Sequence, residues 1–159
     1  MTMRHMINLI SYEIIFPIWR NYLWPNRKDK IEPHSAMLFL DGYDLKNFDY
    51  CPSFFGYFVN DKLVGVNSGH KCYDNSYRSR GLYVDKDYRK KGIGKELLLA
   101  TIAQGKKECA DFIWSYPKQS SWKCYASAGF TLSSDWHLSE NDTNAYCKFS
   151  LNELSKIIS

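Results

Sequence analysis

From Ser53 onward, the hydrophobic residues fall into short apolar, aromatic-rich runs separated by polar residues, a distribution typical of β-strands. Three such runs occupy residues 54–59, 63–72 and 77–84. Asn, Asp and Lys at 60–62 separate the first two runs, and Asn and Asp tolerate the backbone angles of tight turns. Residues 73–76 form the second turn. Two hairpins in series predict an antiparallel meander, because parallel strands would need a long crossover.

The apolar spacing becomes helical from residue 92 to residue 107, and a short apolar run at 110–115 follows. A strand, a helix and another strand in this order predict a βαβ unit with parallel strands and a right-handed crossover. Ser120 or Ser121 can then begin a further helix, which ends near Gly129.

The two ends of the chain have weaker patterns. Residues 6–10 predict a short first strand, and Ser11 can cap a helix that Pro17 divides or kinks. The sequence leaves residues 35–40 open between helix and strand. The remaining predictions are a polar connection at 25–30, a loop at 41–52, a last hairpin of strands 130–132 and 144–150 with its turn at 139–142, and a tail helix at 151–159.

A basic, glycine-containing loop joins the third strand of the meander to the long helix, with the sequence Tyr-Arg-Lys-Lys-Gly-Ile-Gly-Lys at 88–95. A helix start leaves backbone N–H groups without acceptors and has partial positive charge. Gly92 and Gly94 would let a bulky anion approach that backbone closely, which is typical of a phosphate site. The alternative interpretation is a glycine turn beside a solvated run of charges. The glycine spacings of nucleoside-triphosphate loops and dinucleotide fingerprints are absent.

Two motifs in a fixed order make this interpretation more specific. Arg-x-x-Gly-x-Gly at 89–94 follows a strand that ends in Leu-Tyr-Val-Asp, and Tyr-x-x-x-Gly-Phe stands at 125–130. Together they resemble the acyl-CoA loop and the downstream motif of the GNAT superfamily of N-acetyltransferases. The resemblance implies one α+β domain over 1–159, with a mixed, mostly antiparallel sheet that splays around the cofactor and has flanking helices. It also implies acetyl-CoA as cosubstrate and no metal.

The family resemblance also implies which residues bind acetyl-CoA. In the family, the cofactor occupies the opening between the two strands of the βαβ unit. Its pantetheine arm would pair with the backbone of Leu82, Tyr83 and Val84, much as an added strand would. The pyrophosphate would bind the loop and the helix start, through Arg89, Lys90, Lys91, Gly92, Ile93, Gly94 and Lys95.

One family contact to the pantetheine has no counterpart in this chain. Many members have an Asn before the helix that contains the motif tyrosine, and Lys118 and Ser121 stand at the corresponding positions here. Either Lys118 or Ser120 replaces this contact, or no residue does.

The chemistry of acetyl transfer needs an acid for the departing sulfur and a base for the attacking amine. Tyr125 matches the family position that serves the sulfur, and the alternative is that it is a core tyrosine. The strand before the loop lacks the carboxylate that many members have as a base. His70 is the first candidate instead, because a neutral imidazole is a suitable base near neutral pH. Asp74, Asp85 or a chain of water molecules are weaker candidates.

Arg78 and Arg80 are two residues apart on one strand, so they face the same side of the sheet. They either reach solvent, pair with acidic residues, or line the acceptor side of the cleft. In the last case an arginine would bind a carboxylate or phosphate of the acceptor through its planar fork of donors. The preferred acceptors would then be acidic or zwitterionic amines rather than polyamines.

The amino-acid composition argues against several other classes of protein. The five cysteines of this 159-residue chain are odd in number and widely spaced, which argues against a disulfide framework or structural zinc and for reduced thiols in the cytoplasm. Cys124 next to the motif tyrosine is interpreted as an inert thiol, because no histidine is near in sequence to activate it. Glu13 and Pro17 interrupt the apolar stretch at 6–24, so its uninterrupted run is too short for a membrane span. The stretch is interpreted as core.

The leading hypothesis is an N-acetyltransferase that moves an acetyl group from acetyl-CoA to a primary amine of a small molecule or peptide by direct attack. One alternative is a non-catalytic module that binds acyl-CoA and regulates a partner. Another is an acetyltransferase for an aminoacyl group on RNA, with the basic residues at 20–30 contacting phosphates. A net charge of +4 is modest, so a nucleic-acid partner is disfavoured. The sequence leaves the acceptor, the acyl chain length and the choice of monomer or homodimer open.

Overall fold

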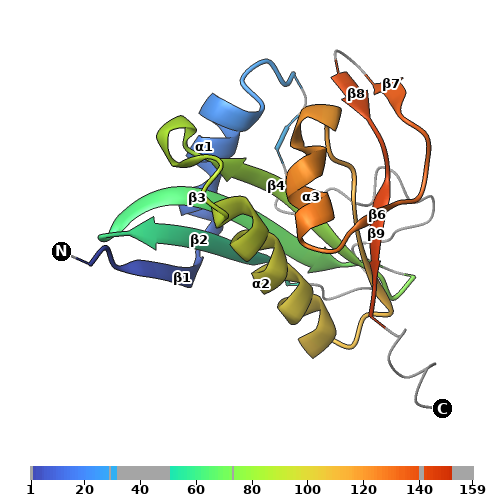
Figure 1. Cartoon of the computed structure of the whole chain (residues 1–159), viewed down its shortest axis with the longest axis horizontal. Coiled ribbons are helices and arrows are strands. Elements are labelled where there is room, and N and C mark those ends of the chain that lie inside the picture. The colour runs from blue at the N-terminus through green and yellow to red at the C-terminus, as the bar shows by residue number, and fades with distance from the viewer. Residues whose placement is uncertain (1, 29, 32–50, 73, 140–141, 152–159) are drawn as a thin grey trace.

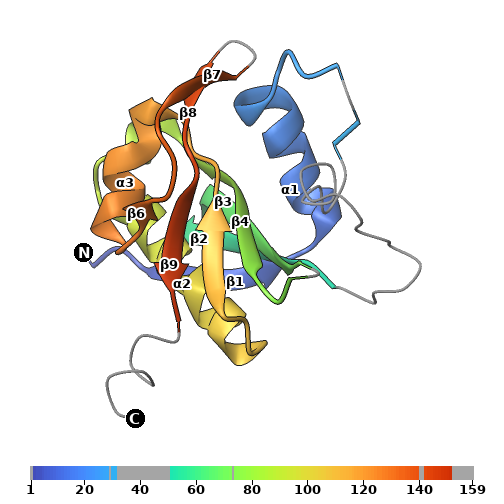
Figure 2. The same ribbon diagram turned by 90° about the vertical axis from the view of Figure 1, so that its right-hand side faces the viewer.

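The computed structural model describes residues 2–28, 30–31, 51–72, 74–139 and 142–151, which form a twisted sheet with helices on both faces (Figures 1 and 2). Seven strands make the main sheet in the order β1-β2-β3-β4-β5-β9-β6, and β7 pairs with β8 separately. The strands are β1 His5–Ile10, β2 Ser53–Val59, β3 Lys62–Lys71, β4 Tyr77–Val84, β5 Phe112–Ser115, β6 Thr131–Leu132, β7 His137–Ser139, β8 Asp142–Asn144 and β9 Cys147–Ser150. The helices are α1 Tyr12–Ile18, the π-helix η1 Trp19–Leu23, the 3-10 turns η3 Lys86–Tyr88 and η4 Gln119–Ser121, α2 Ile93–Lys107 and α3 Trp122–Ser127.

The predicted meander is confirmed. Strands β1 to β4 pair antiparallel with their neighbours, while β4 and β5 pair parallel across α2, as a βαβ unit requires. The turn between β2 and β3 consists of Asn60 and Asp61, whose φ angles are 48° and 67°. Positive φ at both central residues matches the right-handed twist of the two strands, which explains why Asn and Asp stand there.

The two faces of the sheet are covered by different parts of the chain. Helices α2 and α3 lie on one face and α1 with η1 on the other, as the two orthogonal views agree (Figures 1 and 2). On the first face, Leu97 and Leu98 of α2 are fully buried against the sheet. On the second face, Ile15 and Trp19 are fully buried against Phe54 and other apolar residues. One face of the N-terminal apolar stretch is therefore core, as predicted, whereas Leu9, Ile14 and Tyr22 are exposed.

The N-terminal helix shows the expected effect of its proline. Ser11 stands at the N-cap position but makes no side-chain capping bond, and its backbone oxygen accepts from the N–H groups of Ile14 and Ile15. Pro17 lies inside α1, and the helix widens to a π-helix from Trp19 onward. A proline lacks the backbone N–H, so the α-helical bond from residue 17 to the Glu13 oxygen is missing inside α1.

Helix α2 ends in a way that shortens the next strand. Cys109 has φ 62°, the Ala110 N–H donates to the Gly105 oxygen and the Cys109 N–H donates to the Lys106 oxygen, both at 3.0 Å. This is the Schellman arrangement of a left-handed helix end. Residues 110–111 are consequently outside the strand, and β5 begins at Phe112 rather than at Ala110.

The C-terminal region is partly as predicted. Strands β6 and β9 pair antiparallel, as expected for the last hairpin, but the additional pair β7–β8 near its tip was not predicted. The predictions for residues 35–40, for 41–50 and for most of the tail helix fall outside the described residues. Among the helices that the structure describes, none combines the length and the apolar character that crossing a membrane requires.

Candidate active site

An opening in the sheet between β4 and β5 is the centre of the site. The two strands pair at Tyr77 with Ile113 and at Arg78 with Trp114, and these are the pairs formed along the fully described lengths of both strands. Just beyond, the Ser115 hydroxyl donates to the Ser79 backbone oxygen at 2.7 Å. The rest of β4 then diverges from β5, so its backbone edge is available to another extended chain. The predicted splay of the sheet is confirmed.

A β-bulge in β4 bends the strand before its free end. The pairing with β3 shifts between Val66 and Ser68, so that Gly81 and Leu82 together oppose one residue of β3. Gly81 has φ 82°, and its backbone oxygen accepts a 2.8 Å bond from the Trp19 indole. An added Cβ at Gly81 would collide with the Trp19 ring. The bulge was not predicted, although an isolated glycine inside a strand pattern is the usual signal for one.

The glycine loop connects this strand end to the start of α2. Arg89 folds back over β4: its Nε donates to the Val84 oxygen at 2.8 Å, and its guanidinium lies 5.4 Å from the Tyr83 ring centre. Gly92 is the N-cap of α2 with φ 83°, and a Cβ added there would meet no atom within 4 Å. The glycine is therefore needed for its backbone angle, and the space beside it is open.

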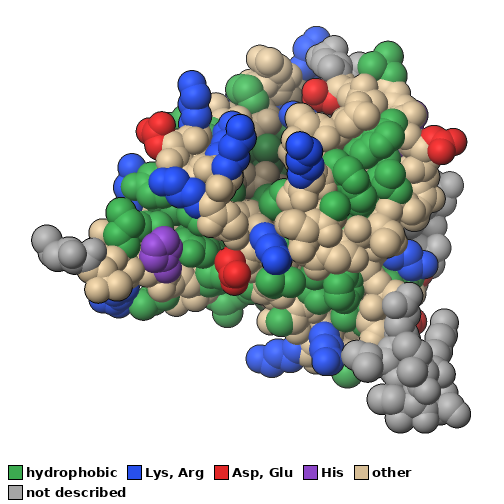
Figure 3. Space-filling model, in the orientation of Figure 1, with side chains coloured by type: hydrophobic (Ala, Val, Ile, Leu, Met, Phe, Trp, Pro, Cys, Tyr) green, Lys and Arg blue, Asp and Glu red, His purple; other side chains and the backbone are tan. Residues whose placement is uncertain are grey.

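The first turn of α2, the end of β4 and α3 meet around Gly94. A Cβ at Gly94 would lie 2.7 Å from the Cys124 sulfur and 3.8 Å from side-chain carbons of Leu82 and Val84. In the space-filling view, a hollow with hydrophobic side chains at its floor and Lys and Arg on its rim opens on this face (Figure 3). The exposed cations of the loop and helix start are Lys86, Arg89, Lys90, Lys91 and Lys95. Their positive charge and the helix start favour an anion here.

Tyr125 is placed by α3 beside the point where β4 and β5 diverge. Its side chain is buried among apolar residues and lies edge-on to Phe130, with ring centres 5.5 Å apart. Burial raises the pKa of the Tyr125 phenol above its ordinary value, and a hydrogen bond with Ser115 offsets part of the rise. The phenol therefore keeps its proton at neutral pH and is a hydrogen-bond donor.

Cys124, the neighbour of Tyr125, is half-buried against Gly94. Burial raises the pKa of its thiol, which keeps the sulfur in the unreactive protonated form.

Arg78 and Arg80, the candidate acceptor-binding residues, lie on the α1 face of the sheet, and their guanidinium groups pack against aromatic rings. The Arg78 guanidinium is 4.7 Å from the Trp114 ring centre, and burial lowers its pKa to about 10. The Arg80 guanidinium is 5.0 Å from the ring of Trp19 and 4.8 Å from that of Trp24. Both arginines are nearly inaccessible to solvent and point to the same face, as their spacing predicts.

His70 pairs with Arg78 across β3 and β4 and is 1% exposed. Its Nδ1 lies 3.2 Å from the Lys71 backbone oxygen. The structure thus places this candidate base in the interior of the sheet.

Lys118 and Ser120 are the two candidates to replace the asparagine that many family members have, and they lie at the start of η4 and within it. Ser120 lies in η4 and is exposed. The Lys118 ammonium is 3.4 Å from an Asp142 carboxylate oxygen, and its backbone bridges to Asn144. Lys118 therefore ties η4 to β8.

An aromatic cluster next to β5 contains a tyrosine–histidine pair that the sequence did not reveal. Tyr116 follows the last residue of β5, and its hydroxyl lies 2.5 Å from Nε2 of His137 in β7. The Nδ1 of that histidine is 3.0 Å from the Asp135 backbone oxygen. If Nδ1 donates to that oxygen, Nε2 accepts from the phenol. Tyr146 contacts both Tyr116 and Trp114, at 4.4 and 6.1 Å between ring centres.

The described residues contain no group of three or more His, Cys, Asp or Glu side chains placed to hold a metal ion.

Comparison with known proteins identifies the family of the chain. The model of the acetyltransferase (GNAT) family matches residues 16–130, more than half of the chain. The chain belongs to this family and is an acyl-CoA-dependent acetyltransferase. A comparison with curated proteins finds no match.

Solved structures show the same fold at low sequence identity. An acetyltransferase of the GNAT family from Staphylococcus aureus has 20% identity and a TM-score of 0.64, with 93% of this chain and 99% of that chain covered. A Bacillus subtilis acetyltransferase in complex with CoA has 20% identity and a TM-score of 0.60, over 94% and 99%. The ribosomal-protein-S18-alanine N-acetyltransferase of Escherichia coli has 15% identity and a TM-score of 0.62, over 93% and 94%.

Proposed function

We propose that this protein transfers the acetyl group of acetyl-CoA to a primary amine of a small molecule or peptide by direct attack. The observation that supports this most is the convergence of three features: the free edge of β4, the open start of α2 and the protonated Tyr125 at the divergence of β4 and β5. Acetyl-CoA bound between them would have its pantetheine beside the strand edge, its pyrophosphate at the anion site and its thioester near the proton donor.

In this proposal acetyl-CoA lies in the opening between β4 and β5 and pairs with the free edge of β4, as an added strand would. Its pantetheine arm pairs with the backbone of Leu82, Tyr83 and Val84, which are partly exposed. Its pyrophosphate accepts from backbone N–H groups of residues 89–95, where Gly92 leaves open space. Ser120, exposed in η4, is the proposed substitute for the family's asparagine contact to the pantetheine. The exposed cations of the loop add a screened attraction.

The transfer step needs one proton donor and one proton acceptor. The amine nitrogen attacks the thioester carbon, the N–C bond forms, and the C–S bond breaks with its electron pair moving to sulfur. The Tyr125 hydroxyl donates a hydrogen bond and then its proton to that sulfur, which gives free CoA thiol. The amine loses one proton to a base, and the Tyr125 phenolate is reprotonated from solvent before the next turnover.

Two groups can take the proton of the amine. His70 has the right chemistry but is buried beside Arg78. The Tyr116 hydroxyl can accept the amine proton while it passes its own to His137 Nε2, and His137 is exposed to solvent. Tyr116 lies just past Ser115, which bonds to β4 where the opening begins.

A pair of glutamine variants separates these two bases. We expect His137→Gln to lower kcat by roughly tenfold or more, because general-base assistance is worth about 10²–10⁴-fold and water substitutes in part. His70→Gln should lower thermal stability instead, with kcat for the folded fraction nearly unchanged. The reverse result, with kcat lost in His70→Gln only, would return the role to His70.

Arg78 and Arg80 would act on the acceptor mainly through their charge. Both remain cationic at neutral pH and lie on the α1 face, so they disfavour an ammonium ion nearby and favour the neutral amine that attacks. They also favour acceptors that contain an anionic group.

A screen of primary amines with acetyl-CoA, monitored by release of free thiol, tests the proposed reaction. We expect turnover with at least one small-molecule or peptide amine and confirmation of the acetylated product by mass spectrometry. Tight CoA binding without turnover of any amine would favour the non-catalytic module instead.

Replacement of Gly92 tests the proposed cofactor site. We expect Gly92→Asn to bind CoA at least tenfold more weakly, because Asn tolerates a positive φ but its side chain occupies the space beside the helix start. Isothermal titration calorimetry measures the change. Ala103→Asn, at an exposed position later in α2, is the matched control and should bind as the wild type does. Unchanged affinity in a folded Gly92→Asn protein would move the pyrophosphate elsewhere.

A further inference from the structure

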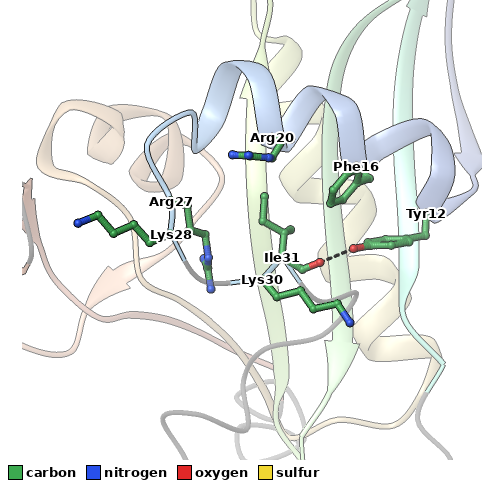
Figure 4. A pocket seen from close by; sticks show the side chains of 7 residues that line it. All are labelled: Tyr12, Phe16, Arg20, Arg27, Lys28, Lys30 and Ile31. Carbon is green, nitrogen blue, oxygen red and sulfur yellow. Dashed lines mark hydrogen bonds between the residues drawn. The ribbon is translucent and has the colours of Figure 1, made fainter.

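A pocket of about 440 Å³ lies on the α1 face of the sheet, away from the hollow on the α2–α3 face. Sites for small molecules have volumes of roughly 300–1,000 Å³, so the pocket is large enough for a metabolite-sized group. Beside Ile31, its lining consists of two aromatic residues and four cations, Tyr12, Phe16, Arg20, Arg27, Lys28 and Lys30 (Figure 4).

The pocket is formed by a helix and by the chain that returns beneath it. Tyr12, Phe16 and Arg20 are four residues apart in succession, so they share one face of the α1–η1 helix. The adjacent face of the helix, with Ile15 and Trp19, is fully buried. The returning segment is anchored at Ile31, which is 4% exposed and whose backbone oxygen accepts a hydrogen bond from the Tyr12 hydroxyl.

The described part of the lining is positively charged. None of the described residues that line the pocket is acidic. Figure 4 shows Arg20, Arg27 and Lys30 around the space beneath the helix, whereas Lys28 points to the side. The Arg27 guanidinium lies 5.3 Å from the Trp24 ring centre, and its buried Nε has no hydrogen-bond partner among the described residues. Like charges gathered in this way repel each other, and a bound anion relieves that repulsion.

The pocket is also next to the strand that forms the transfer site. Trp24 contacts Arg27 of the pocket and Arg80 of β4, so both guanidinium groups lie next to the same indole ring. Trp19, one residue before Arg20, bonds to the Gly81 backbone oxygen at the β4 bulge. A ligand in the pocket is therefore close to the face of β4 where, under the proposed function, the acceptor amine approaches.

We propose that this pocket binds a phosphate group of the acceptor, with Arg20 and Arg27 as its main contacts. Arginine presents a planar fork of donors that matches phosphate oxygens, and Tyr12 and Phe16 supply an apolar wall for the carbon part of the same molecule. The proposal rests on the proposed function and specifies its substrate class as phosphorylated amines. It assigns to the pocket a phosphate other than those of CoA, which the loop before α2 would bind on the opposite face.

Binding of inorganic pyrophosphate to the protein saturated with CoA tests the pocket directly, because CoA then occupies the other anion site. We expect calorimetry to show binding that is weakened at least tenfold in Arg20→Ala/Arg27→Ala, because the variant removes both guanidinium groups that would donate to the phosphate oxygens. The control Lys106→Ala/Lys107→Ala removes the same charge from exposed positions at the end of α2 and should bind as the wild type does. Equal weakening in both variants, or no binding by the wild type, would overturn the assignment.

Kinetics with ethanolamine and O-phosphoethanolamine then test the link to the acceptor. We expect a higher kcat/KM for the phosphorylated amine and loss of this preference in Arg20→Ala/Arg27→Ala, with CoA affinity unchanged. Pyrophosphate binding without any such preference would make the pocket an anion site unrelated to the acceptor. A short RNA that binds there more tightly than pyrophosphate would also overturn the proposal. Absence of transfer to every amine, with pocket binding intact, would instead contradict the proposed function.

Discussion

Tyr125→Phe should lower kcat about 10²-fold or more and leave the affinity for acetyl-CoA nearly unchanged, as expected for loss of a general acid. The hydroxyl acts as charge builds up on sulfur, so its removal raises the energy of the transition state more than that of the bound ground state. Stopped-time assays of thiol release, with the Kd of acetyl-CoA from calorimetry, separate the two effects.

Tyr77→Phe is the matched control for this variant. Tyr77 is also a buried tyrosine of the same apolar cluster, and burial raises its phenol pKa too, but it lies on the paired part of β4. We expect normal turnover from it. Wild-type kcat in Tyr125→Phe, when the chemical step limits the rate, would remove Tyr125 from the mechanism.

The pH dependence gives a second check on Tyr125. Because burial raises its pKa above the ordinary value near 10, the donor form persists as the pH rises from neutral to 10. Turnover in the wild type should therefore show no loss from this group on the alkaline side of neutral. A decline of kcat between pH 8 and about 9.5 that disappears in Tyr125→Phe would contradict the assigned pKa direction.

Gly81→Ala should reduce the free energy of unfolding by about 2–5 kcal/mol. The positive φ costs a side chain roughly 1–2 kcal/mol, and the collision of the new Cβ with the Trp19 ring adds about 1–3 kcal/mol of overpacking. Urea denaturation of the wild type and the variant measures the change, provided that the slopes agree.

Gly92→Ala separates the two contributions. Gly92 has almost the same φ, 83° against 82°, but no atom lies within 4 Å of an added Cβ. The loss there should be only about 1–2 kcal/mol, from the backbone angle alone. Equal losses at both positions would mean that Trp19 does not pack tightly on the β4 bulge.

Features that depend on neighbours in sequence were predictable. The strands β2, β3 and β4, the turn at Asn60 and Asp61 and the helix after Gly92 all follow from local runs of apolar residues and from turn-forming residues. The splay of the sheet followed from the family resemblance rather than from the residues. The shared face of Arg78 and Arg80 followed from the period of a strand.

Features that depend on distant partners were not predictable. Gly81 is required because Trp19, 62 residues earlier, packs on it. Tyr116 and His137 are 21 residues apart and meet only because the fold brings β7 beside the end of β5. The basic residues at 20–30 were visible as a charge group, but their convergence on one pocket depends on the return of the chain to Ile31.

Amide hydrogen exchange with and without CoA tests most directly whether the cofactor lies between β4 and the start of α2. We predict slower exchange within residues 82–84 and 89–95 when CoA is bound, because the pantetheine would pair with the N–H groups on the free edge of β4 and the pyrophosphate would accept from N–H groups of the loop and helix start. Residues 12–31 on the opposite face should exchange at the same rate in both states. Slowed exchange at 12–31, with 82–84 and 89–95 unchanged, would contradict the account.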